Sequence, residues 1–205
     1  MKTFWKELWT AIAATVVLLV MVSGIYPVII WGLGQVIFPY QANGSLITQN
    51  GQVVGSALLA QGFSGAQYFH PRPSQAGTGY DAANSNASNL GPTSKKLMDS
   101  IKDTADAYRK ENNLAAEAIV PADAVTSSFS GLDPHISPKN AQIQAARVAH
   151  ERGISEDVVR NEIEKATDKP FLGLFGDPGV NVLKLNLALD AAKAGMAGKR
   201  TAEKK

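Results

Sequence analysis

The sequence predicts an α+β protein, in which one N-terminal transmembrane helix precedes a domain with a small antiparallel sheet and three or four packed helices. Three observations predict this. No Lys, Arg, Asp or Glu occurs between Glu7 and Arg72, and the first half of that interval is strongly apolar. An Asn-Gly pair then separates two short strand-like segments, and amphipathic helical patterns follow. We expect an anchor region over residues 1–40, a domain over 41–190 and a basic C-terminal tail over 191–205.

Composition excludes several classes of function. The 205 residues leave room for one domain plus an anchor. The 20 basic and 18 acidic residues are nearly balanced, so charge gives no case for binding nucleic acid. The basic tail, with Lys199, Arg200, Lys204 and Lys205, is typical of a solvated chain end. Cysteine is absent, which excludes disulfides, thiol catalysis and thiolate metal sites.

The anchor is predicted to span residues 10–33. A helix needs about 20 apolar residues to cross roughly 30 Å of hydrocarbon, and this run supplies them. Its backbone must bond to itself there, so the segment has to be helical. Trp5 and Trp9 at one end, with Tyr26 and Trp31 at the other, suit the two membrane interfaces.

The flanking charges predict the orientation. Lys2 and Lys6 are the only basic residues near either flank and both precede the span, so the N-terminus should stay in the cytoplasm and the bulk of the chain should lie outside. A cleaved signal peptide is the main alternative, with Val22-Ser23-Gly24 as a weak cleavage site. Apolar residues continue well past Gly24, which favours the anchor.

Small residues share one face of the predicted helix: Thr10, Ala11, Ala14 and Thr15. Such a face allows close approach of a second membrane helix. A solitary helix also tolerates Ala and Thr at any position, so both interpretations stay open.

The domain begins with a predicted hairpin. Leu46–Gln49 and Gln52–Val54 flank Asn50-Gly51, which suits a type I′ turn. A further strand is expected at Ser56–Leu59. The segment Gly62–Pro92 shows no periodicity, but its aromatic residues argue against disorder and predict an ordered loop that either binds something or packs.

Helices are predicted from their caps and spacing. One should start near Ser94; a second should follow the Ser137-Pro138 cap and stop before Gly153; a third should follow Ser155. The segment Val180–Leu189 alternates like a strand, but the alanine-rich stretch after it favours a helix capped by Asn181.

No catalytic or cofactor motif is complete. Ser130, Asp133 and His135 have the residue types of a nucleophilic triad but crowd into six residues, whereas triad members usually come from separate elements. The alternative is a turn, in which Gly131 takes a positive φ and Asp133 bonds the local backbone. No phosphate-binding loop occurs, and the three histidines do not cluster as metal ligands. We therefore expect no catalytic residue, cofactor or metal in this chain.

A set of motifs in order resembles a known family. The motifs are Tyr68–Ser74, Ser88–Pro92, Pro121–Thr126, Ser130–Pro138, Arg147–Ala149 and Val180–Asp190. With the N-terminal anchor, they make the chain similar to the C subunits (KdpC) of the bacterial Kdp potassium-transporting P-type ATPase. The likeness extends to about Asp190. It departs at Ala87 and Phe129, where smaller residues are usual, and at Lys184 in a leucine-rich run.

The resemblance implies an accessory subunit without an active site. In that pump a channel-like subunit selects K⁺ and a P-type ATPase subunit hydrolyses ATP, so both ligands are handled by partners. The C subunit has one helix in the bacterial inner membrane and a periplasmic domain needed for assembly. It has also been described as a catalytic chaperone that raises the affinity of the ATPase subunit for nucleotide. Because ATP is cytoplasmic and the domain is expected outside, such an effect should travel through the complex as coupling between sites rather than by direct contact of this domain with ATP.

Seven residues are predicted to contact partners: Tyr68, Phe69, His70, Arg72, Asp133, Pro134 and His135. The alternative is that they only build tight loops. Two other functions stay open: a membrane-tethered periplasmic hydrolase using Ser130 and His135, and a module that captures K⁺ or another ligand.

Overall fold

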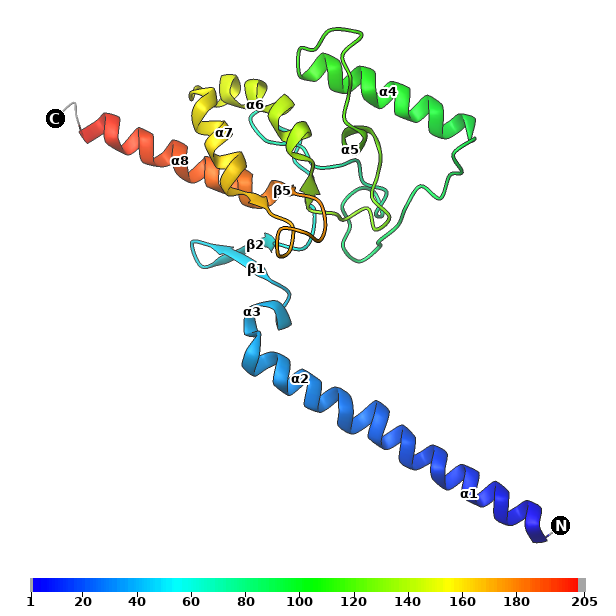
Figure 1. Ribbon diagram of the computed structural model, residues 1–205. Helices are drawn as coiled ribbons and strands as arrows, with labels where there is room; N and C mark the ends of the chain where they lie inside the picture. The colour runs from blue at the N-terminus through cyan, green and yellow to red at the C-terminus, as the bar shows by residue number, and fades with distance from the viewer. Residues whose placement is uncertain (1, 203–205) are drawn as a thin grey trace. The chain divides into compact units, whose positions relative to one another are not determined.

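The computed structural model describes residues 2–202, and side chains over residues 3–195. Of the predicted tail, Lys204 and Lys205 lie outside the described residues, as do the side chains of Lys199 and Arg200. The chain forms two compact units, which divide between Leu46 and Ile47. The secondary structure is α+β, as predicted (Figure 1).

The first unit is dominated by one long helix. It comprises α1 (Lys2–Leu19), a π-helical segment η1 (Val20–Ile25) and α2 (Tyr26–Ile37). Within the described residues, Thr3–Ile37 is the one helix long and apolar enough to cross a membrane, with mean hydropathy 2.4 and none of that apolar stretch buried against the chain. A short helix α3 (Pro39–Ala42) follows.

The π-helical segment ends two residues before Pro27. Proline has no amide hydrogen to donate to the preceding turn, and its ring crowds the carbonyl four residues back. The helix adjusts by widening one turn, so that the N–H of Tyr26 bonds the carbonyl of Met21, five residues back. The apolar run therefore continues as one helix through the proline.

The predicted hairpin of β1 (Leu46–Gln49) and β2 (Gln52–Ser56) follows, and the boundary between the two units falls after its first residue. Asn50 and Gly51 have φ of 52° and 78°, the two positive values that a type I′ turn requires. The expected strand at Ser56–Leu59 is wrong beyond Ser56. The amide of Leu58 bonds the Ser56 hydroxyl and that of Leu59 the Ser56 carbonyl, which closes a turn there.

A second antiparallel sheet joins distant parts of the chain. Its strands are β3 (His135–Ile136), β4 (Thr167–Asp168) and β5 (Gly179–Asn181), in the order β3-β5-β4. The register pairs His135 with Asn181, and both Ile136 and Thr167 with Val180. Strands of two or three residues are too short to show periodicity, so this sheet had no signal in the sequence.

Five helices lie in the part of the second unit that the structure describes, up to residue 202. They are α4 (Lys95–Glu111), α5 (Ala122–Val125), α6 (Pro138–Arg152), α7 (Glu156–Lys165) and α8 (Val182–Ala202). Both predicted ends of α6 are present: the Ser137 hydroxyl accepts from Asn140 N–H, and Gly153 ends the helix in the left-handed conformation. Ser155 occupies the N-cap position of α7 as predicted, but its side chain makes no capping hydrogen bond. Asn181 accepts from Lys184 N–H and starts α8, which confirms the helical interpretation of that segment.

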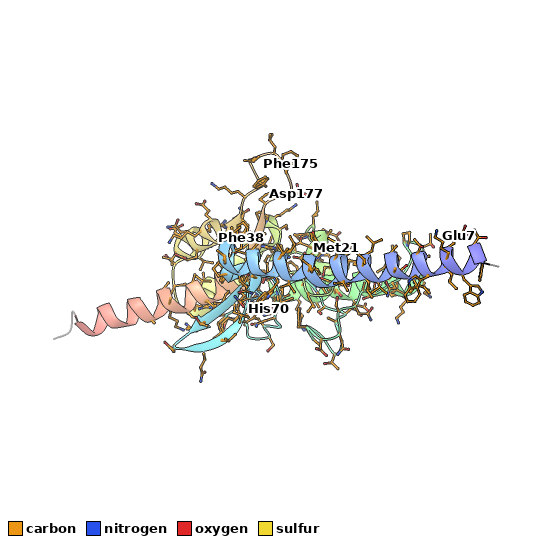
Figure 2. All side chains as sticks on the ribbon, turned by 90° about the horizontal axis from the view of Figure 1, so that it is seen from below. Glu7, Met21, Phe38, His70, Phe175 and Asp177 are labelled. Atoms are coloured by element: carbon orange, nitrogen blue, oxygen red, sulfur yellow. The ribbon has the colours of Figure 1, made fainter. Side chains whose placement is uncertain are left out.

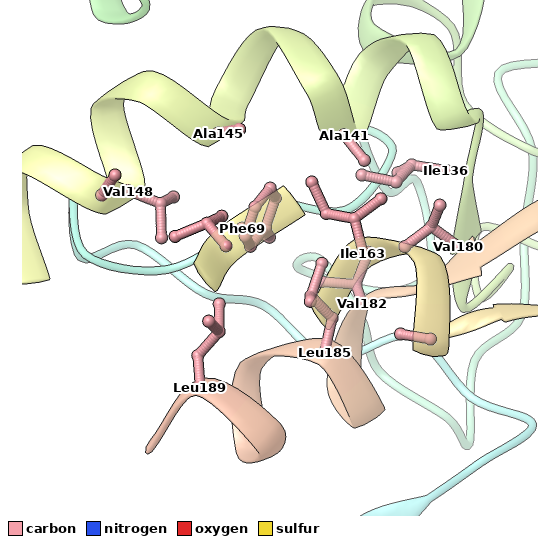
Figure 3. Close-up of a cluster of buried hydrophobic side chains, with 13 residues drawn as sticks. Phe69, Ile136, Ala141, Ala145, Val148, Ile163, Val180, Val182, Leu185 and Leu189 are labelled. Atoms are coloured by element: carbon pink, nitrogen blue, oxygen red, sulfur yellow. The ribbon is translucent and has the colours of Figure 1, made fainter. Parts of the chain in front are cut away.

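The core lies between α6, α7, α8 and β5 (Figure 3). Its largest fully buried apolar side chains come from five different elements and from one loop. They are Phe69, Ile136, Val148, Val159, Val180, Val182, Leu185 and Leu189. The loop contributes Phe69, so the irregular segment Gly62–Pro92 packs into the domain as an ordered structure.

Candidate partner-contact surface

The loop before α4 is held to two helices by buried amide side chains. Asn186 of α8 accepts from Phe69 N–H at 2.8 Å and donates to the Phe69 carbonyl at 3.0 Å. Gln144 of α6 makes the same pair of bonds with the backbone of His70, at 2.8 and 3.1 Å. The backbone of Phe69 and His70 is not paired with another strand, so the two side-chain amides supply the hydrogen-bond partners for its N–H and carbonyl groups.

Two arginines of α6 complete this attachment. Arg147 donates to the carbonyls of Ala66 and Tyr68, and burial lowers its pKa. Arg152 donates to the Gln67 carbonyl, pairs with Asp190 at 2.7 Å and lies over the ring of Tyr68, 5.1 Å from its centre. The loop conformation therefore depends on side chains far away in the sequence.

These contacts locate three of the predicted partner residues. Phe69 is fully buried in the core, so its side chain packs within the domain in this conformation. His70 is partly buried and its Nδ1 lies 2.8 Å from Glu111. Tyr68 is half-buried against Arg152 and against Phe63, whose ring centroid lies 5.3 Å from its own. The side chains of Tyr68, Phe69 and His70 therefore each make contacts within the domain.

The other predicted residues form a second cluster. Arg72 pairs with Asp133 at 3.1 Å and also donates to the backbone of Thr126 and Ser127. Asp133 accepts from the backbone N–H of His135. Pro134 is buried, and its carbonyl accepts from Val182 N–H.

His135 lies between two carboxylates. Its Nδ1 is 3.7 Å from Asp133 and its Nε2 is 2.9 Å from Asp168 on β4. Asp133 and Asp168 raise the pKa of His135, because both favour the imidazolium. Contacts with His135 and Arg72 lower the pKa of Asp133 in turn.

An open cavity of about 500 Å³ lies at this cluster. Its lining includes Arg72, Asp133, His135 and Asp168, together with residues of the connection between β4 and β5. The charged groups that line it are four carboxylates, of Asp123, Asp133, Asp168 and Asp177, together with the side chains of Arg72, Lys169 and His135. Among residues 2–202, no group of three His, Cys, Asp or Glu side chains is placed to hold a metal ion.

The geometry of Ser130 favours the turn over the triad. The Ser130 hydroxyl accepts from Leu132 N–H at 3.1 Å, and the ring nitrogens of His135 face Asp133 and Asp168. A nucleophile would instead be bonded to its base. Gly131 has φ of 69°, as the turn requires.

The small-residue face of α1 is exposed in the chain by itself. The hydroxyls of Thr10 and Thr15 bond the carbonyls of Lys6 and Ala11. With these hydroxyls satisfied, Thr10, Ala11, Ala14 and Thr15 present only small groups outward, which suits close helix packing. That role stays a prediction.

Sequence reasoning missed one exposed feature. The β4–β5 connection carries Phe171, Leu172, Leu174 and Phe175, all exposed. The run Phe-Leu-Gly-Leu-Phe was the available signal, since contiguous apolar residues between Pro and Gly can form either a buried strand or an exposed tip.

Comparison with known proteins gives the family. A family model described as "K+-transporting ATPase, c chain" (KdpC) matches residues 8–191. The chain is 53% identical over 185 residues to the "Potassium-transporting ATPase KdpC subunit" of Mycobacterium tuberculosis H37Rv, covering 90% of this chain and 98% of that relative. It is 47% identical to the protein of the same name from Koribacter versatilis, covering 92% and 96%. The corresponding protein of Nitratidesulfovibrio vulgaris is 50% identical, covering 91% and 95%. The chain thus belongs to the KdpC family of potassium-transporting ATPase subunits.

Proposed function

We propose that this chain is a non-catalytic accessory subunit of a high-affinity, ATP-driven potassium uptake complex in the bacterial inner membrane. The observation that carries the proposal is the extent of the family match, which covers both the apolar helix and the domain. The match therefore includes the apolar helix, which is long enough to cross a membrane, as well as the globular part. Its partners in this proposal are a channel-like subunit that selects K⁺ and a P-type ATPase subunit.

The domain is proposed to lie in the periplasm. Lys2 and Lys6 precede the apolar helix, and the next basic residue is Arg72, so the charge asymmetry favours a cytoplasmic N-terminus. Alkaline phosphatase fused to the C-terminus of the full chain should be active, because it folds only outside the cytoplasm. A fluorescent C-terminal reporter that folds in the cytosol would contradict the proposal.

Assembly is the first role proposed. The chain should co-purify with the channel-like and ATPase subunits after extraction in a mild detergent, with membrane lipid around the helix. Substituting Ala11 and Ala14 by leucine would place bulky side chains on the small-residue face. If that face packs on a partner helix, the substitution should keep the two helices apart and weaken the association. Recovery of the wild-type chain alone, at full yield, would count against the whole proposal.

Modulation of the ATPase subunit is the second role. We expect the complex that contains this chain to bind nucleotide more tightly than the complex without it, through coupling between sites. A photoreactive ATP analogue should label the ATPase subunit and leave this chain unlabelled. Labelling of a residue in this chain would replace coupling by direct contact.

The hydrolase alternative is tested with a serine-directed phosphonate. The Ser130 hydroxyl accepts a backbone hydrogen bond and His135 faces two carboxylates; this arrangement favours a turn, so we expect no adduct. Calorimetry of the full chain in detergent with K⁺ tests the capture module, for which saturable heat at micromolar K⁺ would be required.

A further inference from the structure

The connection between β4 and β5 carries a concentrated group of exposed apolar side chains, whereas the other large exposed apolar residues of the domain, such as Ile119 and Phe129, are scattered along the chain. Phe171, Leu172, Leu174 and Phe175 are 71%, 75%, 81% and 65% exposed. We name these four residues the apolar tip. Figure 2 shows the loop that carries Phe175 and Asp177 projecting from the domain. Four large apolar side chains within five residues of a soluble surface usually mark an interaction site.

The tip is ordered by its own backbone. Phe171 and Phe175 exchange two hydrogen bonds, at 2.9 and 3.0 Å, and Gly173 N–H bonds the Pro170 carbonyl at 2.9 Å. The strands at its base pair with each other in the three-stranded sheet. A surface formed before binding loses little conformational entropy when it binds, so its apolar area contributes more fully to affinity.

The surroundings of the tip are charged, and the charges are of both signs. Lys169 and Asp177 flank it, and among the described residues neither enters an ion pair. The cavity at its base adds Arg72, Asp133 and His135. An aromatic centre within a mixed polar rim is the composition of a protein–protein interface. An anionic membrane surface would instead favour a ring of basic residues alone.

Chain length limits where the partner can lie. The apolar helix ends at Ile37 and β1 begins at Leu46. The connection of residues 38–45 spans at most about 28 Å when fully extended. The domain of a membrane-anchored chain is therefore confined near the membrane surface, where its neighbours are lipid headgroups and the exposed parts of other membrane proteins.

We propose that the apolar tip is the anchor by which the domain docks on the outward-facing surface of a membrane-embedded subunit of the same pump. The partner site is a hydrophobic pocket with charges that complement Lys169 and Asp177. This inference rests on the proposed function, since it takes the partner from the complex to which the chain is assigned.

Photocrosslinking in membranes identifies what the tip touches. A benzophenone amino acid replaces Phe175 in the full chain, expressed together with the other pump subunits; the matched control replaces Phe129, which is 91% exposed and lies outside the tip. We expect the Phe175 probe to form a covalent product with a membrane-embedded pump subunit, identified by mass spectrometry, and the Phe129 probe to form much less of it. A product with phospholipid alone, or no product, overturns the inference.

Exchange kinetics measure the energetic contribution. The double variant Phe171→Ser, Phe175→Ser is compared with Phe129→Ser by displacing the chain from the purified complex with an excess of differently tagged wild-type chain. Removing two central aromatic anchors should raise the dissociation rate by about 30-fold or more, whereas Phe129→Ser should change it by less than about 3-fold. Equal urea midpoints for the two variants show that both domains are folded.

The two proposals fail differently. If the wild-type chain co-purifies with the pump and the double variant dissociates at the wild-type rate, docking through the tip is wrong and the accessory role stands. If the wild-type chain does not co-purify at all, the accessory role fails, and the docking inference fails with it.

Discussion

The substitution Asn186→Ala tests whether the irregular loop is held by side chains rather than by chance packing. Asn186 is fully buried and bonds both the N–H and the carbonyl of Phe69, which is fully buried too. Its removal leaves two backbone groups without partners in a dry core. Each such group costs about 1–3 kcal/mol, so the free energy of unfolding should fall by about 2–6 kcal/mol. For a domain of this size that corresponds to a drop in Tm of roughly 4–24 °C.

The assay is urea unfolding of the full chain in detergent, followed by far-UV circular dichroism. Tryptophan fluorescence is unsuitable, because the three tryptophans, Trp5, Trp9 and Trp31, all lie in the helical anchor. The matched control is Asn161→Ala on the exposed face of α7, which should change stability by less than about 0.5 kcal/mol. A loss below about 1 kcal/mol for Asn186→Ala would refute the argument, since water would then be satisfying Phe69.

Three further predictions concern turns, caps and charge. In Gly131→Ala the new Cβ would lie 2.7 Å from the Asn86 carbonyl oxygen, so the free energy of unfolding should fall by about 3 kcal/mol. The control Gly153→Ala has a similar positive φ, but its Cβ would meet nothing within 4 Å. It should lower the free energy of unfolding by only about 1–2 kcal/mol. Chemical denaturation compares the two, and equal losses would exclude the clash. Ser137→Ala removes the cap of α6 and should cost about 1–2 kcal/mol in the same assay, against a smaller loss for Ser155→Ala, whose side chain makes no capping bond. Because the pKa of His135 is raised in the folded state, its stabilising effect is complete below about pH 6.5 and is lost as pH rises through the folded pKa. His135→Gln should therefore lose more stability relative to wild type at pH 6 than at pH 9, and a constant difference would contradict this.

Local signals predicted much of the helical framework. The caps at Ser137 and Asn181, the left-handed Gly153 and the Asn-Gly turn each depend on a few consecutive residues, whose backbone preferences act wherever the segment is placed. The prediction failed at Leu58, because a hydrogen bond from its amide to the Ser56 hydroxyl closed a turn where a further strand was expected.

The candidate site was predicted only in part. Arg72, Asp133 and His135 were singled out together from their motifs, and the structure brings them into one cluster. Asp168, which completes the surroundings of His135, comes from a two-residue strand with no signal of its own. Phe69 was expected to contact a partner. An aromatic residue in a polar loop can also turn inward, and in the structure the Phe69 side chain is fully buried in the core.

The sequence by itself determined the apolar helix, the hairpin turn and the starts and ends of the main helices, because these follow from composition and from interactions between near neighbours. The tertiary structure alone decided that Gln144 and Asn186 hold the loop, that three short strands meet in a sheet, and that the apolar tip stays exposed. Each of these depends on groups that are far apart in the chain. Their pairing is set by which buried polar atoms find partners and which apolar surface is covered when the domain closes.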